Sequence, residues 1–197
     1  MNYAKLKEIN KVYFGYEDIS KAFGITPESA MVSVNRYVKQ GMLLRVKRNI
    51  YILKDRWGAL KREEKFAIAN IVQVPSYISL MSALDYYEIT TQMQRNFIES
   101  IAVKRTKEIS LSGTVLNFTK ISEKLYFGFL KQDGFFIATP EKAFLDAVYL
   151  MSLNRYNFDL SSIDRGKLNI GKIKAIAEKF PQKTREVLKK YGYAAKA

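Results

Sequence analysis

The residues best suited to chemistry lie between Ile25 and Leu53. Short polar and long cationic side chains recur there at the three- and four-residue spacing of one helix face. Ser29, Ser33, Arg36 and Gln40 share this face, and Asn35 and Lys39 flank it. Such side chains suit hydrogen bonds with base edges and ion pairs with phosphates, so the pattern favours duplex DNA as the ligand. The alternative is a helix whose polar face is merely solvated.

A helix from Thr26 to about Gln40 must position these side chains. Thr26 can accept a hydrogen bond from a free backbone N–H, and proline is tolerated at the first helical position that follows. Gly41 is the residue type that ends helices in a left-handed conformation. An apolar stripe at helical period, with Ala30 and Val34 as members, is expected to face a core.

Two short strand-like runs follow this helix, residues 43–46 and 50–53. The linking residues end with Asn49, which tolerates the positive φ of a tight turn. A short helix over residues 18–23 precedes the segment, and a first helix is expected over residues 2–14. Helix, turn, helix and a basic hairpin predict a winged helix-turn-helix.

Three basic residues of the hairpin are expected to reach the DNA backbone or the minor groove: Arg45, Lys47 and Arg48. Arg36, on the helix, either reads guanine with two hydrogen bonds or contacts phosphate only, and both alternatives stay open.

Histidine and cysteine are both absent. The chain therefore lacks the commonest general base, the Ser-His and Cys-His pairs, and the Cys and His ligands of zinc. Glu141 and Asp146 could suggest a carboxylate-only nuclease that uses a divalent metal, but at five residues apart on one helix they do not share a face. We expect no enzyme activity, no metal and no cofactor, with such a nuclease as the alternative.

Basic charge is concentrated at both ends of the chain, whose formal net charge is +14. Residues 1–57 carry +6, residues 58–164 carry zero and residues 165–197 carry +8. The lysines of the C-terminal part are Lys172, Lys174, Lys179, Lys183, Lys189 and Lys190. They would either extend the DNA footprint or form the surface of another activity, and the simplest alternative is a helical face kept basic for solubility.

The pattern predicts two domains, residues 1–57 and residues 58–197. In the second, helical stretches at 60–72 and 79–87 precede strand-like runs at 97–104, 108–112, 115–119, 125–130 and 135–138. Thr139 and Pro140 repeat the capping chemistry of Thr26 and open a helix to about Met151, and two more helices follow on either side of Pro181. The expected fold class is α+β, a winged helix-turn-helix followed by a larger domain with a mostly antiparallel sheet and C-terminal helices.

Nearly the whole chain resembles the antitoxins of AbiE-type abortive-infection systems, the type IV toxin–antitoxin modules of bacteria. Three segments carry the resemblance: residues 38–51 (VKQGMLLRVKRNIY), 77–87 (YISLMSALDYY) and 138–146 (ATPEKAFLD). The family commonly has glycine where Asn49 stands, and asparagine can adopt the same turn. The combination of the last two segments with the winged helix makes the resemblance specific.

The resemblance implies a bifunctional protein. Its N-terminal domain would bind inverted repeats in its own promoter and repress transcription, and its second domain would counteract a nucleotidyltransferase toxin without necessarily binding it. We expect a cytoplasmic protein without membrane contact, monomeric or weakly dimeric, that pairs on DNA. The alternative among binding proteins is a winged-helix regulator whose second domain senses a small ligand.

Overall fold

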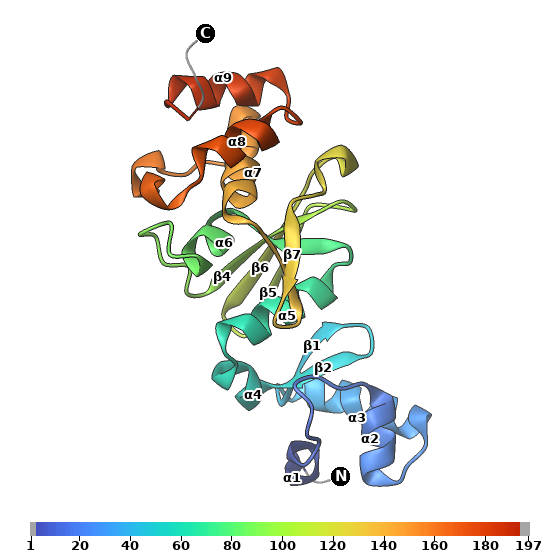
Figure 1. Ribbon diagram of the computed structural model, residues 1–197. Helices are drawn as coiled ribbons and strands as arrows, with labels where there is room; N and C mark the ends of the chain where they lie inside the picture. Colours follow the sequence, from blue (N-terminus) through green and yellow to red (C-terminus); the bar gives the residue numbers. More distant parts are fainter. Residues whose placement is uncertain (1–2, 194–197) are drawn as a thin grey trace. The chain divides into compact units, whose positions relative to one another are not determined.

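A computed structural model describes residues 3–193 of the chain (Figure 1). The described residues form two compact units, residues 3–68 with 110–113 and residues 69–109 with 114–193. The domain boundary expected after Trp57 stays a prediction, although the first compact unit extends to Ile68. Within residues 3–193, no helix is both long and apolar enough to cross a lipid bilayer.

The first unit is built from short helices and one hairpin. Its elements are α1 (Tyr3–Lys7), α2 (Tyr16–Phe23), α3 (Pro27–Lys39), β1 (Leu43–Lys47), β2 (Ile50–Leu53) and α4 (Lys54–Ala59), and α5 (Arg62–Val72) crosses into the second unit. Strands β1 and β2 pair antiparallel.

Helix α3 and the hairpin behind it have the local chemistry that the sequence predicts. The Thr26 hydroxyl accepts a hydrogen bond from the Ser29 backbone N–H at 3.3 Å, and Gly41 lies in the left-handed region at φ 70°. The stripe of Ala30, Val34 and Tyr37 is buried in a core with residues of α1, α2 and both strands. Burial of apolar surface stabilises this packing by about 25 cal/mol for each Å² removed from water.

The helix expected over residues 2–14 is wrong in its extent, because α1 ends at Lys7. Beyond it the chain becomes irregular, and Phe14 exchanges backbone hydrogen bonds with Tyr51 of β2 at 2.9 and 3.0 Å. This bridge requires extended backbone, which overrides the helical spacing of Leu6 and Ile9. Both of those residues are nevertheless buried in the core, whereas Tyr13 is exposed.

The second unit combines a six-stranded sheet with helices. The strands of this sheet are β3 (Ser76–Ile78), β4 (Phe97–Ala102), β5 (Lys107–Leu111), β6 (Thr114–Lys120), β7 (Phe129–Gln132) and β8 (Phe135–Ala138), and the last two residues of β5 belong to the first unit. The α-helices of the second unit are α6 (Leu80–Tyr86), α7 (Pro140–Ser152), α8 (Ile170–Ala177) and α9 (Gln182–Lys190). Short 3₁₀ turns occur at Glu123–Leu125, Leu160–Ser162 and Arg165–Lys167.

The sheet is mixed, with the strand order β5-β6-β4-β3-β8-β7. Antiparallel pairing joins β7 to β8, as the expected antiparallel sheet requires, and also joins β4 to β3, a strand that the sequence did not predict. The pairs β4·β6 and β3·β8 are parallel, and the sequence did not predict them. Residues 125–130 do not form one strand: a 3₁₀ turn precedes β7. The chain is therefore a mixed α and β protein, as expected, but the sheet is less uniformly antiparallel.

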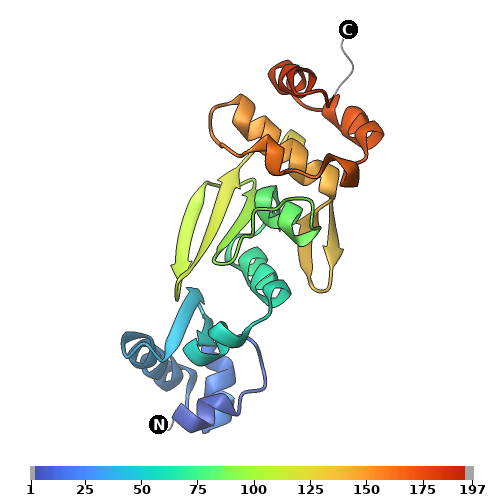
Figure 2. The ribbon, with the colours of Figure 1, turned by 90° about the vertical axis from the view of Figure 1, so that its left-hand side faces the viewer.

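Helix α7 is the centre of the second unit. It packs against α6, α8 and α9, and α6 also packs against β4. Figure 2 shows α7 running between the sheet and the two C-terminal helices. Apart from Tyr149 and Met151, the side chains from Glu141 to Ser152 are buried, including the charged Lys142 and Asp146.

Candidate functional site

The outer face of α3 carries most of the residues that the sequence proposes for DNA contact. Asn35, Arg36 and Lys39 are exposed, and their side chains have no hydrogen-bond or ion-pair partner within residues 3–193. The Arg36 guanidinium lies 5.7 Å from the centre of the Tyr37 ring, a cation–π distance that limits its conformations. These three polar groups are therefore available to an external ligand.

The two serines of the prediction are less available. Ser29 is exposed, but its Oγ accepts a hydrogen bond from the Thr26 hydroxyl at 3.2 Å. Ser33 is half-buried toward the core side of α3.

Sequence reasoning missed two apolar residues on the same outer face. Val32 is 67% exposed and Met31 is 48% exposed. Val32 precedes Asn35 by three residues and Arg36 by four, so all three side chains are neighbours on the helix surface. The signal was present in the sequence as an apolar residue within the polar face.

The β1–β2 hairpin presents its basic residues to solvent. Arg45, Lys47 and Arg48 are all exposed, as predicted for the hairpin. Asn49 adopts φ 58° in the turn, the left-handed conformation expected of it. Its side-chain Oδ1 also accepts a hydrogen bond from the Tyr16 backbone N–H at 2.8 Å, which joins the hairpin to the first turn of α2.

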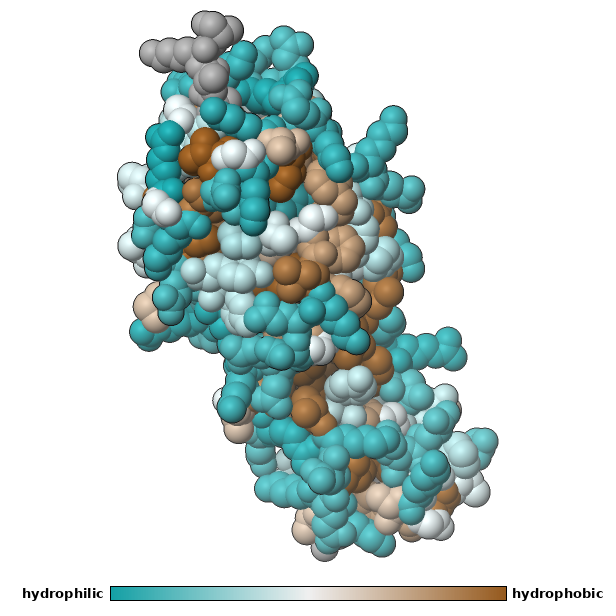
Figure 3. Space-filling model, viewed as in Figure 1, coloured by the Kyte–Doolittle hydropathy of each residue, from teal (hydrophilic) through white to brown (hydrophobic). Residues whose placement is uncertain are grey.

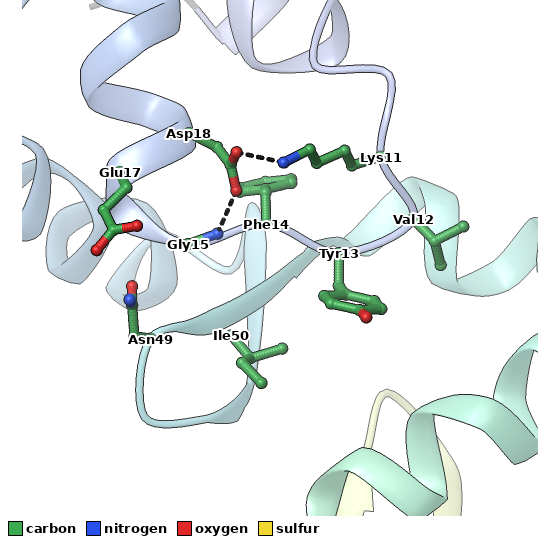
Figure 4. Close-up of a pocket in the computed structure, with 9 residues that line it drawn as sticks. All are labelled: Lys11, Val12, Tyr13, Phe14, Gly15, Glu17, Asp18, Asn49 and Ile50. Atoms are coloured by element: carbon green, nitrogen blue, oxygen red, sulfur yellow. Dashed lines mark hydrogen bonds and ion pairs between the residues drawn. The ribbon is translucent and has the colours of Figure 1, made fainter. Parts of the chain in front are cut away.

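A pocket of about 500 Å³ lies beside this junction (Figure 4). Asp18 accepts hydrogen bonds from the Gly15 backbone N–H at 3.0 Å and from Lys11 Nζ at 2.6 Å. Gly15 approaches Asn49 so closely that an added Cβ would lie 2.9 Å from Asn49 Oδ1. The pocket is lined by both signs of charge, since Glu17 and Asp18 face it together with Lys11.

The second unit contains a buried polar cluster around Asp146. Its carboxylate accepts hydrogen bonds from the Ser79 hydroxyl at 2.8 Å and the Tyr77 hydroxyl at 2.9 Å, and it pairs with Lys142 Nζ. Lys142 Nζ also donates to Tyr77 at 2.8 Å and lies 5.1 Å from the centre of the Phe127 ring. Burial lowers the pKa of Lys142, and the Asp146 carboxylate counteracts that shift.

This cluster contains side chains of the kinds that act as nucleophiles and bases in enzymes, but none of them is exposed to solvent. Lys142, Asp146 and Ser79 are each 0% exposed, so the cluster joins β3, the start of α6 and α7 and is closed to solvent. Glu141 points elsewhere and accepts a hydrogen bond from the Asn169 backbone N–H at 3.3 Å. Residues 3–193 contain no group of three carboxylate side chains that could hold a metal ion.

Glu99 of β4 is a second buried carboxylate. Its oxygens accept hydrogen bonds from the Met81 backbone N–H at 3.0 Å and from the Tyr156 hydroxyl at 2.9 and 3.1 Å. Burial raises the pKa of Glu99 to about 7, against the opposing effect of these hydrogen bonds.

A small pocket of about 270 Å³ opens in the second unit next to the end of β6. Its polar lining comes from Thr106, Lys120, Ser122, Tyr149 and Arg155, without a carboxylate. Arg155 donates a hydrogen bond to the Lys120 backbone oxygen at 3.2 Å, and the Lys120 N–H donates to Thr106 Oγ1 at 3.1 Å. Two cations and several hydroxyl groups are thus held around one space, an arrangement that suits a small anion.

The six C-terminal lysines named in the sequence are all exposed on or beside α8 and α9. Hydrophilic side chains project around this region on the face shown in Figure 3. None of the six forms an ion pair within residues 3–193. Arg185 of α9, which is not one of them, pairs with Glu178. Lys179 Nζ lies 4.6 Å from the centre of the Phe127 ring.

Among solved structures, the chain is similar in fold to the RV2827C protein from Mycobacterium tuberculosis. The TM-score is 0.58 at 11% sequence identity, over 96% of this chain and 75% of that chain. At this identity the similarity concerns the fold alone. No family model and no curated protein sequence matches the chain.

Proposed function

We propose that the first unit is a winged helix-turn-helix that binds duplex DNA, with α3 in the major groove and the β1–β2 hairpin as its wing. The observation that carries this proposal is the outer face of α3, where Asn35, Arg36 and Lys39 are exposed and form no hydrogen bond or ion pair within residues 3–193. Side chains of these types recognise bases and phosphates. The exposed basic residues of the hairpin add a second contact with the phosphate backbone.

For the second unit we propose the antitoxin activity that the family resemblance implies, with repression of its own promoter by the first unit. Two of the resembling segments supply the buried cluster, Tyr77 and Ser79 from one and Lys142 and Asp146 from the other. Because their polar groups are all buried, these residues stabilise the fold of the second unit. The resemblance in these two segments is therefore a resemblance in fold-stabilising residues. Antitoxin activity itself would then come from exposed residues such as the C-terminal lysines.

Binding of the full chain to DNA from upstream of its own gene tests the first part of this proposal. The comparison is a scrambled duplex of equal composition, across a salt series. We expect preference for the upstream duplex, and Arg36→Ala should reduce that preference by about 5- to 150-fold if Arg36 reads guanine. Arg95→Ala, an exposed arginine of the second unit, is the matched control and should change nothing.

Equal weakening of both duplexes by Arg36→Ala would mean that Arg36 contacts phosphate only. Equal, steeply salt-dependent binding of both duplexes by the wild type would contradict the proposed recognition of a promoter.

The pocket at Lys120 and Arg155 favours a second candidate function, a regulator whose second unit senses a small anion. Titration with pyrophosphate in the same DNA-binding assay distinguishes the anion-sensing regulator from the antitoxin. A change in DNA affinity that Lys120→Ala abolishes would support the regulator, and neutralisation of the neighbouring toxin in co-expressing cells, unaffected by Lys120→Ala, would support the antitoxin.

A further inference from the structure

Val32 lies at the centre of the exposed face of α3. It is on the opposite side of the helix from buried Ala30 and Val34, and its side chain is 67% exposed. Asn35, Arg36 and Lys39 surround it at three-, four- and seven-residue spacings along the helix. An exposed apolar side chain therefore lies at the centre of a face whose other exposed side chains include Met31, Glu28 and the polar or cationic Asn35, Arg36 and Lys39.

The surrounding charge indicates what can cover this residue. Arg36 and Lys39 have no ion-pair partner within residues 3–193, and exposed Arg45, Lys47 and Arg48 belong to the same unit. A polyanion complements these cations, whereas a second copy of the same face would oppose like charges. Duplex DNA offers a polyanionic surface that also displays an apolar group at its reading edge, the C5-methyl group of thymine in the major groove.

We infer that Val32 contacts a thymine methyl group in the operator and makes this chain select a thymine at that position. The inference rests on the proposed DNA-binding function and names what the α3 face recognises. Asparagine pairs with adenine and arginine with guanine through two hydrogen bonds each. The thymine therefore lies beside bases read by Asn35 or Arg36, and Met31, 48% exposed one residue earlier, extends the apolar contact.

Replacement of thymine by deoxyuridine tests this inference, because it removes the methyl group and keeps every hydrogen-bonding group of the base pair. The probe is the duplex from upstream of the gene, with thymines replaced one at a time. We expect wild-type affinity to fall about fourfold at a contacted thymine, the effect of exposing one methyl-sized apolar group. Val32→Ala should lose most of the preference for the thymine duplex over the deoxyuridine duplex.

A matched control separates this effect from a general loss of surface. Val74→Ala removes the same atoms from a valine that is 54% exposed in the second unit, and should keep the thymine preference of the wild type. Val32→Thr keeps one methyl group and should give an intermediate preference. Circular dichroism and thermal unfolding of each variant verify that the fold is retained.

The possible failures are distinguishable. Preference for the upstream duplex over a scrambled one, with equal affinity for thymine and deoxyuridine at every position, would overturn the inference and leave DNA recognition intact. No preference for the upstream duplex would overturn both. A wild-type dimer in sedimentation that Val32→Ala dissociates, with an unchanged thymine-to-deoxyuridine ratio, would show that a second copy covers Val32 and would also overturn the inference.

Discussion

At the scale of single residues, Asn49 has two structural roles, one of its backbone and one of its side chain. Its backbone supplies the left-handed turn of the hairpin, which glycine could also supply. Its side chain also accepts the hydrogen bond from the Tyr16 N–H, which glycine could not. Gly15 leaves the space for that side chain, since a Cβ there would meet Asn49 Oδ1 at 2.9 Å. Gly15 and Asn49 therefore fit as a pair and hold the hairpin against α2.

We predict that Gly15→Ala destabilises the protein by about 1–3 kcal/mol, the usual cost of overpacking. Asn49→Gly should cost about 1 kcal/mol through the lost hydrogen bond. The double variant should lose less free energy of unfolding than the sum of the two single losses, because Asn49→Gly removes the atom closest to the new Cβ. Some strain will persist, since the Asn49 backbone oxygen would lie 3.1 Å from the new Cβ. Urea unfolding of the four proteins measures these effects.

Gly58→Ala is the control for this cycle. Nothing lies within 4 Å of a Cβ at Gly58, which is in helix α4, so alanine should be neutral or slightly stabilising. Strictly additive losses for Gly15→Ala and Asn49→Gly would contradict the proposed pairing of these residues.

At the scale of elements, the turn from β3 into α6 combines backbone strain with two buried carboxylates. Leu80 begins α6 at φ 55°, a conformation that L-residues rarely adopt, and its side chain is fully buried. On one side of it Asp146 accepts from Ser79, and on the other Glu99 accepts from the Met81 N–H. The two carboxylates hold the strained turn in place, so changes in their charge should affect the stability of the second unit.

The pKa of Glu99, raised to about 7 by burial, predicts a specific pH dependence. Because the folded-state pKa exceeds the ordinary value of 4.5, the contribution of Glu99 to stability is complete below pH 4.5. It declines as pH rises and is lost above about pH 7. We expect the free energy of unfolding to fall between pH 4.5 and pH 8 by on the order of 3 kcal/mol from this group.

Glu99→Gln should remove most of this slope, because its amide oxygen can still accept from Met81 and does not ionise. The chain has no histidine, so few other side chains change charge in this range. Urea unfolding of both proteins at several pH values provides the measurement. A slope of equal size in the Gln variant would assign the pH dependence to another group.

At the scale of the whole molecule, the proposed DNA binding predicts two kinds of contact, which the charge distribution assigns to different parts of the chain. Base contacts set sequence preference, whereas exposed lysines contact phosphates and contribute affinity that depends on salt. The first unit carries exposed basic residues on α3 and on the hairpin, and the six exposed lysines on or beside α8 and α9 form no ion pair within residues 3–193. Phosphate contacts add affinity but supply no sequence preference, which depends on the base contacts.

We therefore predict that Lys→Glu substitution at Lys172, Lys174, Lys179 and Lys183 leaves the ratio of upstream to scrambled DNA affinity unchanged within about twofold. A smaller salt slope would place these lysines in the DNA footprint, and lost toxin neutralisation at an unchanged slope would make them the antitoxin surface. Lys→Glu at Lys124 and Lys131, exposed on other parts of the second unit, is the control. A collapsed affinity ratio would contradict the division between base and phosphate contacts.

The sequence by itself determined the elements whose cause is local. Thr26 caps α3, Gly41 ends it and Asn49 turns the hairpin, and each depends on neighbours within a few residues. The exposure of Asn35, Arg36 and Lys39 follows from the same helical period that buries Ala30. Val32 was missed because the polar face was defined by its polar members, although the helical period places Val32 among them.

Only the tertiary structure decided the centre of the second unit. Strand β3 has three residues and no periodicity of its own, yet it pairs with β4 on one side and β8 on the other. Lys142 meets Tyr77 across 65 residues of sequence, and burial alone gives Glu99 its raised pKa. Local patterns report backbone preferences over a few residues, whereas these contacts depend on which distant segments exclude water together, a property of the assembled core.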